Sequence, residues 1–179
     1  MLFRSQVTKV LITTISGFYL ACLLMPGLEE NLYLNKYLVF NNGEYWRLIT
    51  VALTHGGLTH LFFNMYALLV LGNSLESAIG QKKFLALFVI SQIGASFASI
   101  YFGAINVVSV GASGAIFGLF GAMIVISKRF GLETKSTYII IGINFAIGFI
   151  FPNIDWHAHL GGLITGVVAA SVLLSPARS

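Results

Sequence analysis

The sequence predicts an all-α polytopic membrane protein, a bundle of six transmembrane helices with a membrane-embedded first external loop. Of its 179 residues 57% are hydrophobic and only 9% are charged, and the mean hydropathy is +0.88. About a quarter of the residues of a soluble domain are charged, so this chain cannot cover itself with a polar surface. Its apolar stretches are long and continuous rather than alternating, which indicates helices and not a barrel. We expect a single domain over 1–179.

Each of six apolar segments has close to the ~20 residues that a helix needs to cross a bilayer. They comprise residues 7–27, 57–78, 82–103, 112–128, 136–152 and 157–175. The first resembles a secretory signal, but "LLMPGL" follows where a cleaved precursor would turn polar, so we expect a retained span. The single cysteine, Cys22, excludes an internal disulfide.

The connection over residues 28–56 is the longest, and we expect it on the external side. It is too apolar for a solvated loop and is interrupted by "NNG", so it is interpreted as partly membrane-embedded, with Trp46 at headgroup level. Short connections on the other side hold most of the basic residues, which places both termini in the cytoplasm. These residues are Arg4, Lys9, Lys82, Lys83, Lys128, Arg129, Lys135 and Arg178, against Lys36 and Arg47 outside.

Polar side chains inside the bilayer are costly and are therefore functional candidates. All four histidines, at positions 55, 60, 157 and 159, fall at the external ends of the second and sixth spans, and Ser113 begins the fourth. Fifteen residues separate Ser113 from Lys128, or ~22 Å of helix, which leaves the serine several ångströms inside a ~30 Å core. The same spacing from Leu174 places His159 at a matching depth.

Small residues offer a route for these two side chains to meet. Gly114 and Gly118 form a smooth strip on the fourth span, and Gly162 and Gly166 form one on the sixth. If the strips face each other, Ser113 and His159 come within hydrogen-bond distance. A second pair, His60 and Asn64, shares one helical face and can donate hydrogen bonds to an oxyanion, as can the unpaired N–H groups of Ser113 and Gly114.

Structural alternatives remain for each of these motifs. "GASG" is typical of close helix packing, and "HLFFN" of interhelical hydrogen bonding. Asp155 is interpreted as a cap of the sixth helix rather than a triad member, and Glu76 as a partner of backbone or a basic residue. The histidines also allow a metal-binding protein, but there is no "HExxH" and no cysteine cluster, so we expect no metal.

The motifs "GASG", "AHLGGLITG", "THGGLTHLFFN" and "EYWRL", in this order and on these spans, resemble the rhomboid intramembrane serine proteases from about Glu44 to Gly166. The resemblance implies a six-span rhomboid-like bundle and a dyad of Ser113 and His159 without a third, acidic member. His60, Asn64 and the Ser113 N–H would stabilise the oxyanion. Gly111, which keeps the turn into the serine helix tight, and Gly114 are implied as further oxyanion or substrate-binding residues. Gly162 and Gly166 would seat the base, and Trp46 and Arg47 would brace the external loop.

The resemblance also implies an endopeptidase that needs no cofactor and cleaves transmembrane protein substrates near the external membrane face. The compact six-span layout indicates a bacterial plasma membrane, and an organelle is the alternative that the same layout allows. Phe117 stands where relatives often have a tyrosine stacked on the catalytic histidine, so the ring remains and the hydroxyl is lost. The loop "GAINVVSV" is expected to dip into the membrane. The alternative is a proteolytically inactive rhomboid-like protein that binds client helices. The scattered charges indicate no nucleic-acid partner, and nothing in the sequence indicates an oligomeric state.

Overall fold

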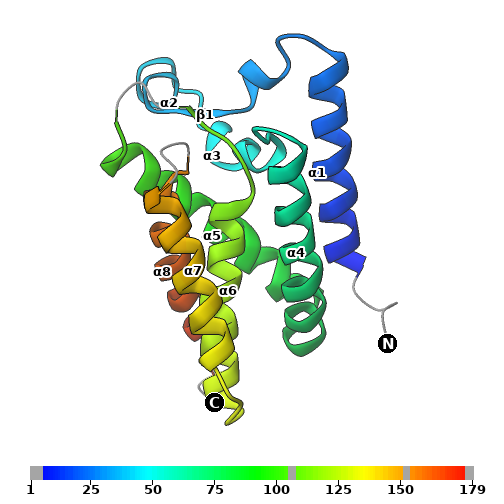
Figure 1. The fold of residues 1–179 in the computed structure, drawn as a ribbon, viewed down its shortest axis with the longest axis vertical. Coiled ribbons are helices and arrows are strands. Elements are labelled where there is room, and N and C mark those ends of the chain that lie inside the picture. Colours follow the sequence, from blue (N-terminus) through cyan, green and yellow to red (C-terminus); the bar gives the residue numbers. More distant parts are fainter. Residues whose placement is uncertain (1–5, 105–107, 151–153, 176–179) are drawn as a thin grey trace.

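The computed structural model describes residues 6–104, 108–150 and 154–175. Six long helices pack lengthwise in alternating directions (Figure 1). They are α1 (Gln6–Leu24), α4 (Leu58–Ile79), α5 (Gln81–Phe102), α6 (Ser113–Arg129), α7 (Lys135–Ile150) and α8 (Trp156–Leu173). Each expected span coincides with one of these helices to within three residues, although positions 151–152 of the fifth span lie outside the described residues.

The chain is an all-α polytopic bundle. Among the described residues, α1, α4, α5 and α8 are long and apolar enough to cross a membrane. With 17 and 16 residues, α6 and α7 are shorter. Helix α6 is short because it begins only at Ser113.

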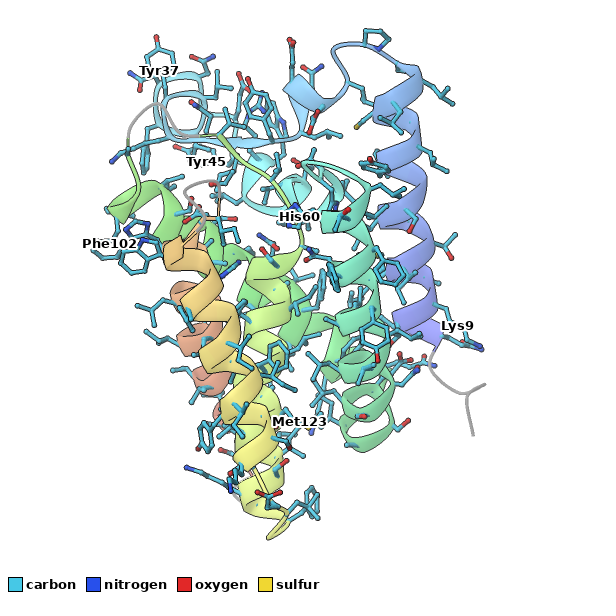
Figure 2. All side chains as sticks on the ribbon, in the orientation of Figure 1. Lys9, Tyr37, Tyr45, His60, Phe102 and Met123 are labelled. Carbon is cyan, nitrogen blue, oxygen red and sulfur yellow. The ribbon has the colours of Figure 1, made fainter. Side chains whose placement is uncertain are left out.

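The segment between α1 and α4 is folded at one end of the bundle (Figure 1). It contains η1 (Glu29–Asn31), β1 (Leu34–Asn35), α2 (Lys36–Asn42), α3 (Arg47–Thr50) and η2 (Val51–Leu53). Tyr37 and Tyr45 lie at this end of the bundle in Figure 2. β1 pairs antiparallel with β2 (Val108–Ser109), a two-residue contact that the sequence analysis did not predict. Of the loop "GAINVVSV", positions 105–107 lie outside the described residues.

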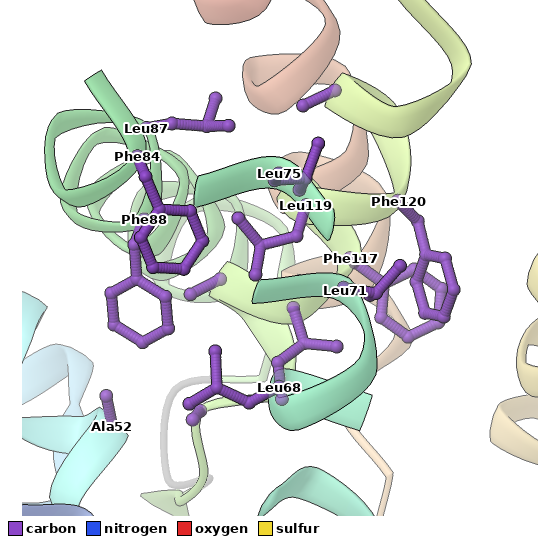
Figure 3. Close-up of a cluster of buried hydrophobic side chains, with 14 of the residues drawn as sticks. Ala52, Leu68, Leu71, Leu75, Phe84, Leu87, Phe88, Phe117, Leu119 and Phe120 are labelled. Atoms are coloured by element: carbon purple, nitrogen blue, oxygen red, sulfur yellow. The ribbon is translucent and has the colours of Figure 1, made fainter. Parts of the chain in front are cut away.

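The core lies where α4, α5 and α6 meet (Figure 3). Leu68, Leu75, Phe84, Leu87 and Leu119 are fully enclosed there. Every residue of α6 from Gly114 to Ala122 is buried, so this helix is surrounded by its neighbours on all sides. The serine helix is therefore the central element of the bundle.

Helices α6 and α8 approach closely along the two glycine strips, and this part of the prediction is confirmed. A Cβ atom at Gly162 would overlap the carbonyl of Gly114, and one at Gly166 would overlap the carbonyl of Gly118. A glycine also allows α8 to pack closely on α5, where a Cβ atom at Gly161 would overlap the Ala98 side chain. In the absence of side chains at these positions the backbones pack directly.

Candidate active site

Ser113 and His159 lie together at the N-terminal ends of α6 and α8. The Oγ atom of Ser113 is 3.0 Å from the Nε2 atom of His159, although 46 residues separate them in the chain. His159 occupies the first turn of α8 and is buried. The facing glycine strips bring Ser113 and His159 to the same level along the two helices, because Gly114 lies one residue after Ser113 and Gly162 lies three residues after His159. A hydroxyl within hydrogen-bond distance of an imidazole has the geometry of a nucleophile beside its base.

The ring of His159 is held flat against Phe117. Their ring centroids are 4.1 Å apart and their planes differ by 12°. Phe145 of α7 contacts Phe117 edge-on at 5.1 Å. The sequence analysis did not single out Phe145, because a phenylalanine in an apolar span has no feature that distinguishes it from a lipid-facing residue.

His60 lies over the turn that leads into α6. A Cβ atom at Gly111 would be 2.9 Å from Cε1 of His60, so the imidazole rests against the backbone two residues before Ser113. Gly111 has φ +117°, a conformation that L side chains rarely adopt. Its N–H donates to the carbonyl of Val51 at 3.0 Å, which ties the turn to η2.

Asn64 is buried one turn below His60 on the same face of α4. Its Nδ2 atom donates to the His60 carbonyl at 2.9 Å. Its Oδ1 atom is buried and has no hydrogen-bond partner among the described residues. An amide with unused hydrogen-bonding capacity in a buried site is available to a ligand or to water.

His55 supports His60 from the loop before α4. The two rings make an edge-to-face contact at 5.2 Å. Burial, and secondarily the charge of His60, lowers the pKa of His55 to about 3. His55 is therefore neutral at physiological pH and acts on His60 by packing.

Trp46 and Arg47 lie in the outer segment and contact its backbone rather than Ser113. Arg47 is buried, and its guanidinium donates to the carbonyls of Glu30 and Tyr33 at 2.9 and 2.8 Å. The indole N–H of Trp46 donates to the carbonyl of Asn31 at 3.2 Å. These bonds fasten η1 and the start of β1 to α3.

Asp155 caps α8, as the sequence analysis favoured. Its side chain accepts a hydrogen bond from the N–H of Ala158 at 3.0 Å. It is not bonded to the imidazole, because Nδ1 of His159 has no hydrogen-bond partner among the described residues. Within the described ranges, no three His, Cys, Asp or Glu side chains are grouped closely enough to hold a metal ion.

The geometry thus combines a nucleophile, a base and nearby hydrogen-bond donors, which is the set of groups that acyl transfer requires. Further donors come from the backbone, because Ser113 and Gly114 are in the first turn of α6, where N–H groups lack acceptors within the helix.

Comparison with known proteins identifies relatives of this chain. Residues 42–176 match the Rhomboid domain. The chain is 42% identical to the rhomboid protease GluP of Bacillus subtilis over 75% of this chain and 27% of that protein. It is 40% identical to RHOMBOID-like protein 5 of Arabidopsis thaliana over 84% of this chain and 50% of that protein. A further relative, 34% identical over 74% of this chain and 39% of its own length, is the inactive RHOMBOID-like protein 8 of Arabidopsis thaliana. The chain thus spans half or less of the length of these relatives.

Proposed function

The chain belongs to the rhomboid family, and on that premise we propose that it is an intramembrane serine endopeptidase. The observation that carries the proposal is the 3.0 Å contact between Ser113 Oγ and His159 Nε2 at the outer end of an apolar bundle. A similar protein is named as a rhomboid protease, which supports proteolysis as the reaction.

His159 removes the proton from Ser113 as Oγ attacks the scissile carbonyl carbon, and a tetrahedral oxyanion forms. His60, Asn64 and the N–H of Ser113 donate hydrogen bonds to that oxyanion. Loss of one such donor typically lowers kcat by about 10²–10³-fold. His159 then gives its proton to the leaving amine as the C–N bond breaks. Water, deprotonated by His159, hydrolyses the acyl-enzyme and releases Ser113.

The remaining site residues act by support. Gly111 holds the turn before the nucleophile against His60, Gly114 and the pair Gly162 and Gly166 allow the close approach of α6 and α8, and Phe117 keeps the imidazole oriented. Trp46 and Arg47 stabilise the outer segment. No cofactor has a part in these steps.

The substrates that fit this site are transmembrane proteins, cleaved near the external face of the membrane. A peptide bond within a regular helix is shielded from attack, so small or helix-breaking residues are expected near the cleavage point. On the charge distribution described above, both termini lie in the cytoplasm. The compact six-span layout and the similarity to a Bacillus subtilis protein support a bacterial plasma membrane and one domain over 1–179.

The first experiment measures cleavage of a transmembrane substrate by the purified protein in lipid. Ser113→Ala is expected to abolish cleavage, because no other hydroxyl contacts His159 among the described residues. Ser127→Ala, near the other end of the same helix, is the control and is expected to retain activity, although Ser127 is buried and Ser113 only partly so. Full activity in Ser113→Ala would refute the mechanism.

A proteolytically inactive protein that binds client helices is the second candidate, since one relative is named as inactive. A fluorophosphonate probe, which forms a covalent bond with an activated serine, separates the two. The protease is labelled at Ser113, and the inactive protein is not. The intact dyad favours the protease.

A further inference from the structure

Asp155 joins three segments of the chain through one carboxylate. Its Oδ1 atom accepts the capping hydrogen bond from Ala158 N in α8. Its Oδ2 atom accepts hydrogen bonds from two hydroxyls, Ser99 Oγ of α5 and Ser109 Oγ of β2, each at 2.5 Å. A helix cap requires only one acceptor atom, so the contacts of Oδ2 are additional to the cap.

The position of Ser109 in the chain gives these contacts their significance. Ser109 lies four residues before Ser113, and Asp155 lies four residues before His159. The bond between them therefore joins the segment that delivers the nucleophile to the start of the helix that carries the base. Both serines are buried, with 7% and 9% exposure for Ser99 and Ser109. Hydrogen bonds to an ionised acceptor are stronger than those between neutral groups.

Two other contacts lie near this carboxylate, and neither joins the segment before Ser113 to α8. His157 faces the carboxylate from within α8, but its Nδ1 atom is nearest the capping oxygen, 3.7 Å from Oδ1. On the opposite side, the turn before Ser113 is tied to η2 by the Gly111 N–H. Apart from the Ser113–His159 contact itself, the hydrogen bonds found in the described residues between the segment before Ser113 and the start of α8 run through Oδ2 of Asp155. They reach Ser109 directly and through Ser99, whose hydroxyl lies 3.0 Å from that of Ser109.

We propose that Asp155 is a positioning residue, which sets the distance between Ser113 and His159 by binding Ser109 and Ser99 through Oδ2. The inference rests on the proposed function. Asp155 makes no triad hydrogen bond to the imidazole, because Nδ1 of His159 has no hydrogen-bond partner among the described residues, and its oxygens accept from Ala158, Ser99 and Ser109 instead. A displacement of about 1 Å between reacting groups costs about 10²-fold in rate, so a polar tie at this point affects catalysis directly.

The test uses the full chain in lipid and measures the time course of fluorophosphonate labelling. The amplitude reports the fraction of folded protein, and the rate constant reports the geometry of the dyad in that fraction. A purely structural role changes the amplitude but not the rate constant. Four variants are compared: Asp155→Ser, which keeps one capping oxygen and lacks Oδ2; Asp155→Asn, which keeps the cap and offers an amide to the hydroxyls; Ser109→Ala; and Ser99→Ala.

We expect Asp155→Ser and Ser109→Ala to lower the rate constant by about tenfold or more. Asp155→Asn restores part of the rate, because the serine hydroxyls can accept from its amide. Ser99→Ala is the graded comparison. It removes one bond to Oδ2 and the 3.0 Å contact between the Ser99 and Ser109 hydroxyls, but it leaves the direct bond between Ser109 and Asp155 in place, so its effect is the smallest. The kcat for a transmembrane substrate falls in the same order, with KM unchanged.

An unchanged rate constant in Ser109→Ala would overturn the positioning role, even if Asp155→Ser failed to fold. Equal losses in Ser99→Ala and Ser109→Ala would also overturn it, because they would indicate general stabilisation. If the wild-type protein itself is not labelled at Ser113, it is the proposed function that fails.

Discussion

The stacking of Phe117 on His159 is the clearest single-residue contribution to the site beyond the dyad. At 4.1 Å and nearly parallel, the phenyl ring restricts the imidazole to one plane. Aromatic pairs of this kind contribute about 0.5–1.5 kcal/mol beyond the area they bury. Phe120 is also buried on α6 and contacts Phe117 edge-on at 6.0 Å, but among the ring contacts of the described residues it has none with His159.

Phe117→Leu is therefore expected to lower kcat by about twofold to tenfold, the equivalent of that stacking energy. Phe120→Leu, a substitution of the same size on the same helix, serves as the control. We expect both to lose similar stability, about 1 kcal/mol, while Phe120→Leu retains its kcat. Thermal unfolding curves of the two variants give the fraction of folded protein, to which each kcat is referred. Equal losses of kcat in the two variants would show that the ring does not orient the imidazole.

Residues whose chemistry is out of place in lipid could be predicted from the sequence alone. Ser113, His60 and His159 are polar in apolar segments, and their depths follow from helix rise. The contribution of Phe145 could not be predicted in this way, since its role depends on which face of α7 meets α6. That orientation is set by tertiary packing and leaves no local pattern in the sequence.

At the scale of elements, Glu76 joins the end of α4 to the beginning of α1. Its carboxylate accepts hydrogen bonds from the N–H groups of Val7 and Thr8 at 3.0 and 2.8 Å, and from the Thr8 hydroxyl at 2.7 Å. Of the two partners expected for Glu76, backbone or a basic residue, the structure shows backbone. A buried carboxylate at a helix N-terminus satisfies N–H groups that the helix leaves unpaired and interacts favourably with the helix dipole.

Glu76→Gln is expected to lower the free energy of unfolding by about 1–3 kcal/mol, because an amide has one acceptor oxygen for three donors and loses the charge. Thr8→Val removes only the hydroxyl and serves as the graded control, with a loss nearer about 1 kcal/mol. Denaturant unfolding in detergent measures both. Glu76 is 16 residues from His60 along α4, or ~24 Å, so the fluorophosphonate rate constant of the folded protein is expected to stay unchanged. A change in that rate would contradict a purely structural role.

The elements themselves differ in how far the sequence predicts them. The six long helices follow from hydropathy and length. The pairing of β1 with β2 does not, because two residues per strand are too few for a periodic pattern. The bonds of Asp155 to Ser99 and Ser109 join segments 56 and 46 residues apart, and only the folded chain brings them together. Capping by Asp155 was predictable because it is local.

At the scale of the whole molecule, charge and topology agree. One end of the bundle holds the start of α1, the α4–α5 and α6–α7 connections and the end of α8. The segment between α1 and α4 lies at the opposite end (Figure 1). The basic residues of that end within the described part of the chain are Lys9, Lys82, Lys83, Lys128, Arg129 and Lys135. At the opposite end Arg47 is paired with Glu44 at 2.6 Å and contributes little free positive charge. On the positive-inside rule we therefore propose that the end with Ser113 and His159 faces outside the cell.

Single cysteines test this orientation directly. In a Cys22→Ser background, Tyr37→Cys on α2 and Leu132→Cys in the α6–α7 connection replace side chains that are 59% and 62% exposed. A membrane-impermeant maleimide is expected to label Tyr37→Cys in intact spheroplasts and Leu132→Cys only after permeabilisation, because the reagent reaches only the external face. Cys22→Ser alone controls for background, and labelling of Ser113 by fluorophosphonate confirms that each variant is folded. The reverse pattern of maleimide labelling would invert the protein in the membrane and place its active site on the cytoplasmic side.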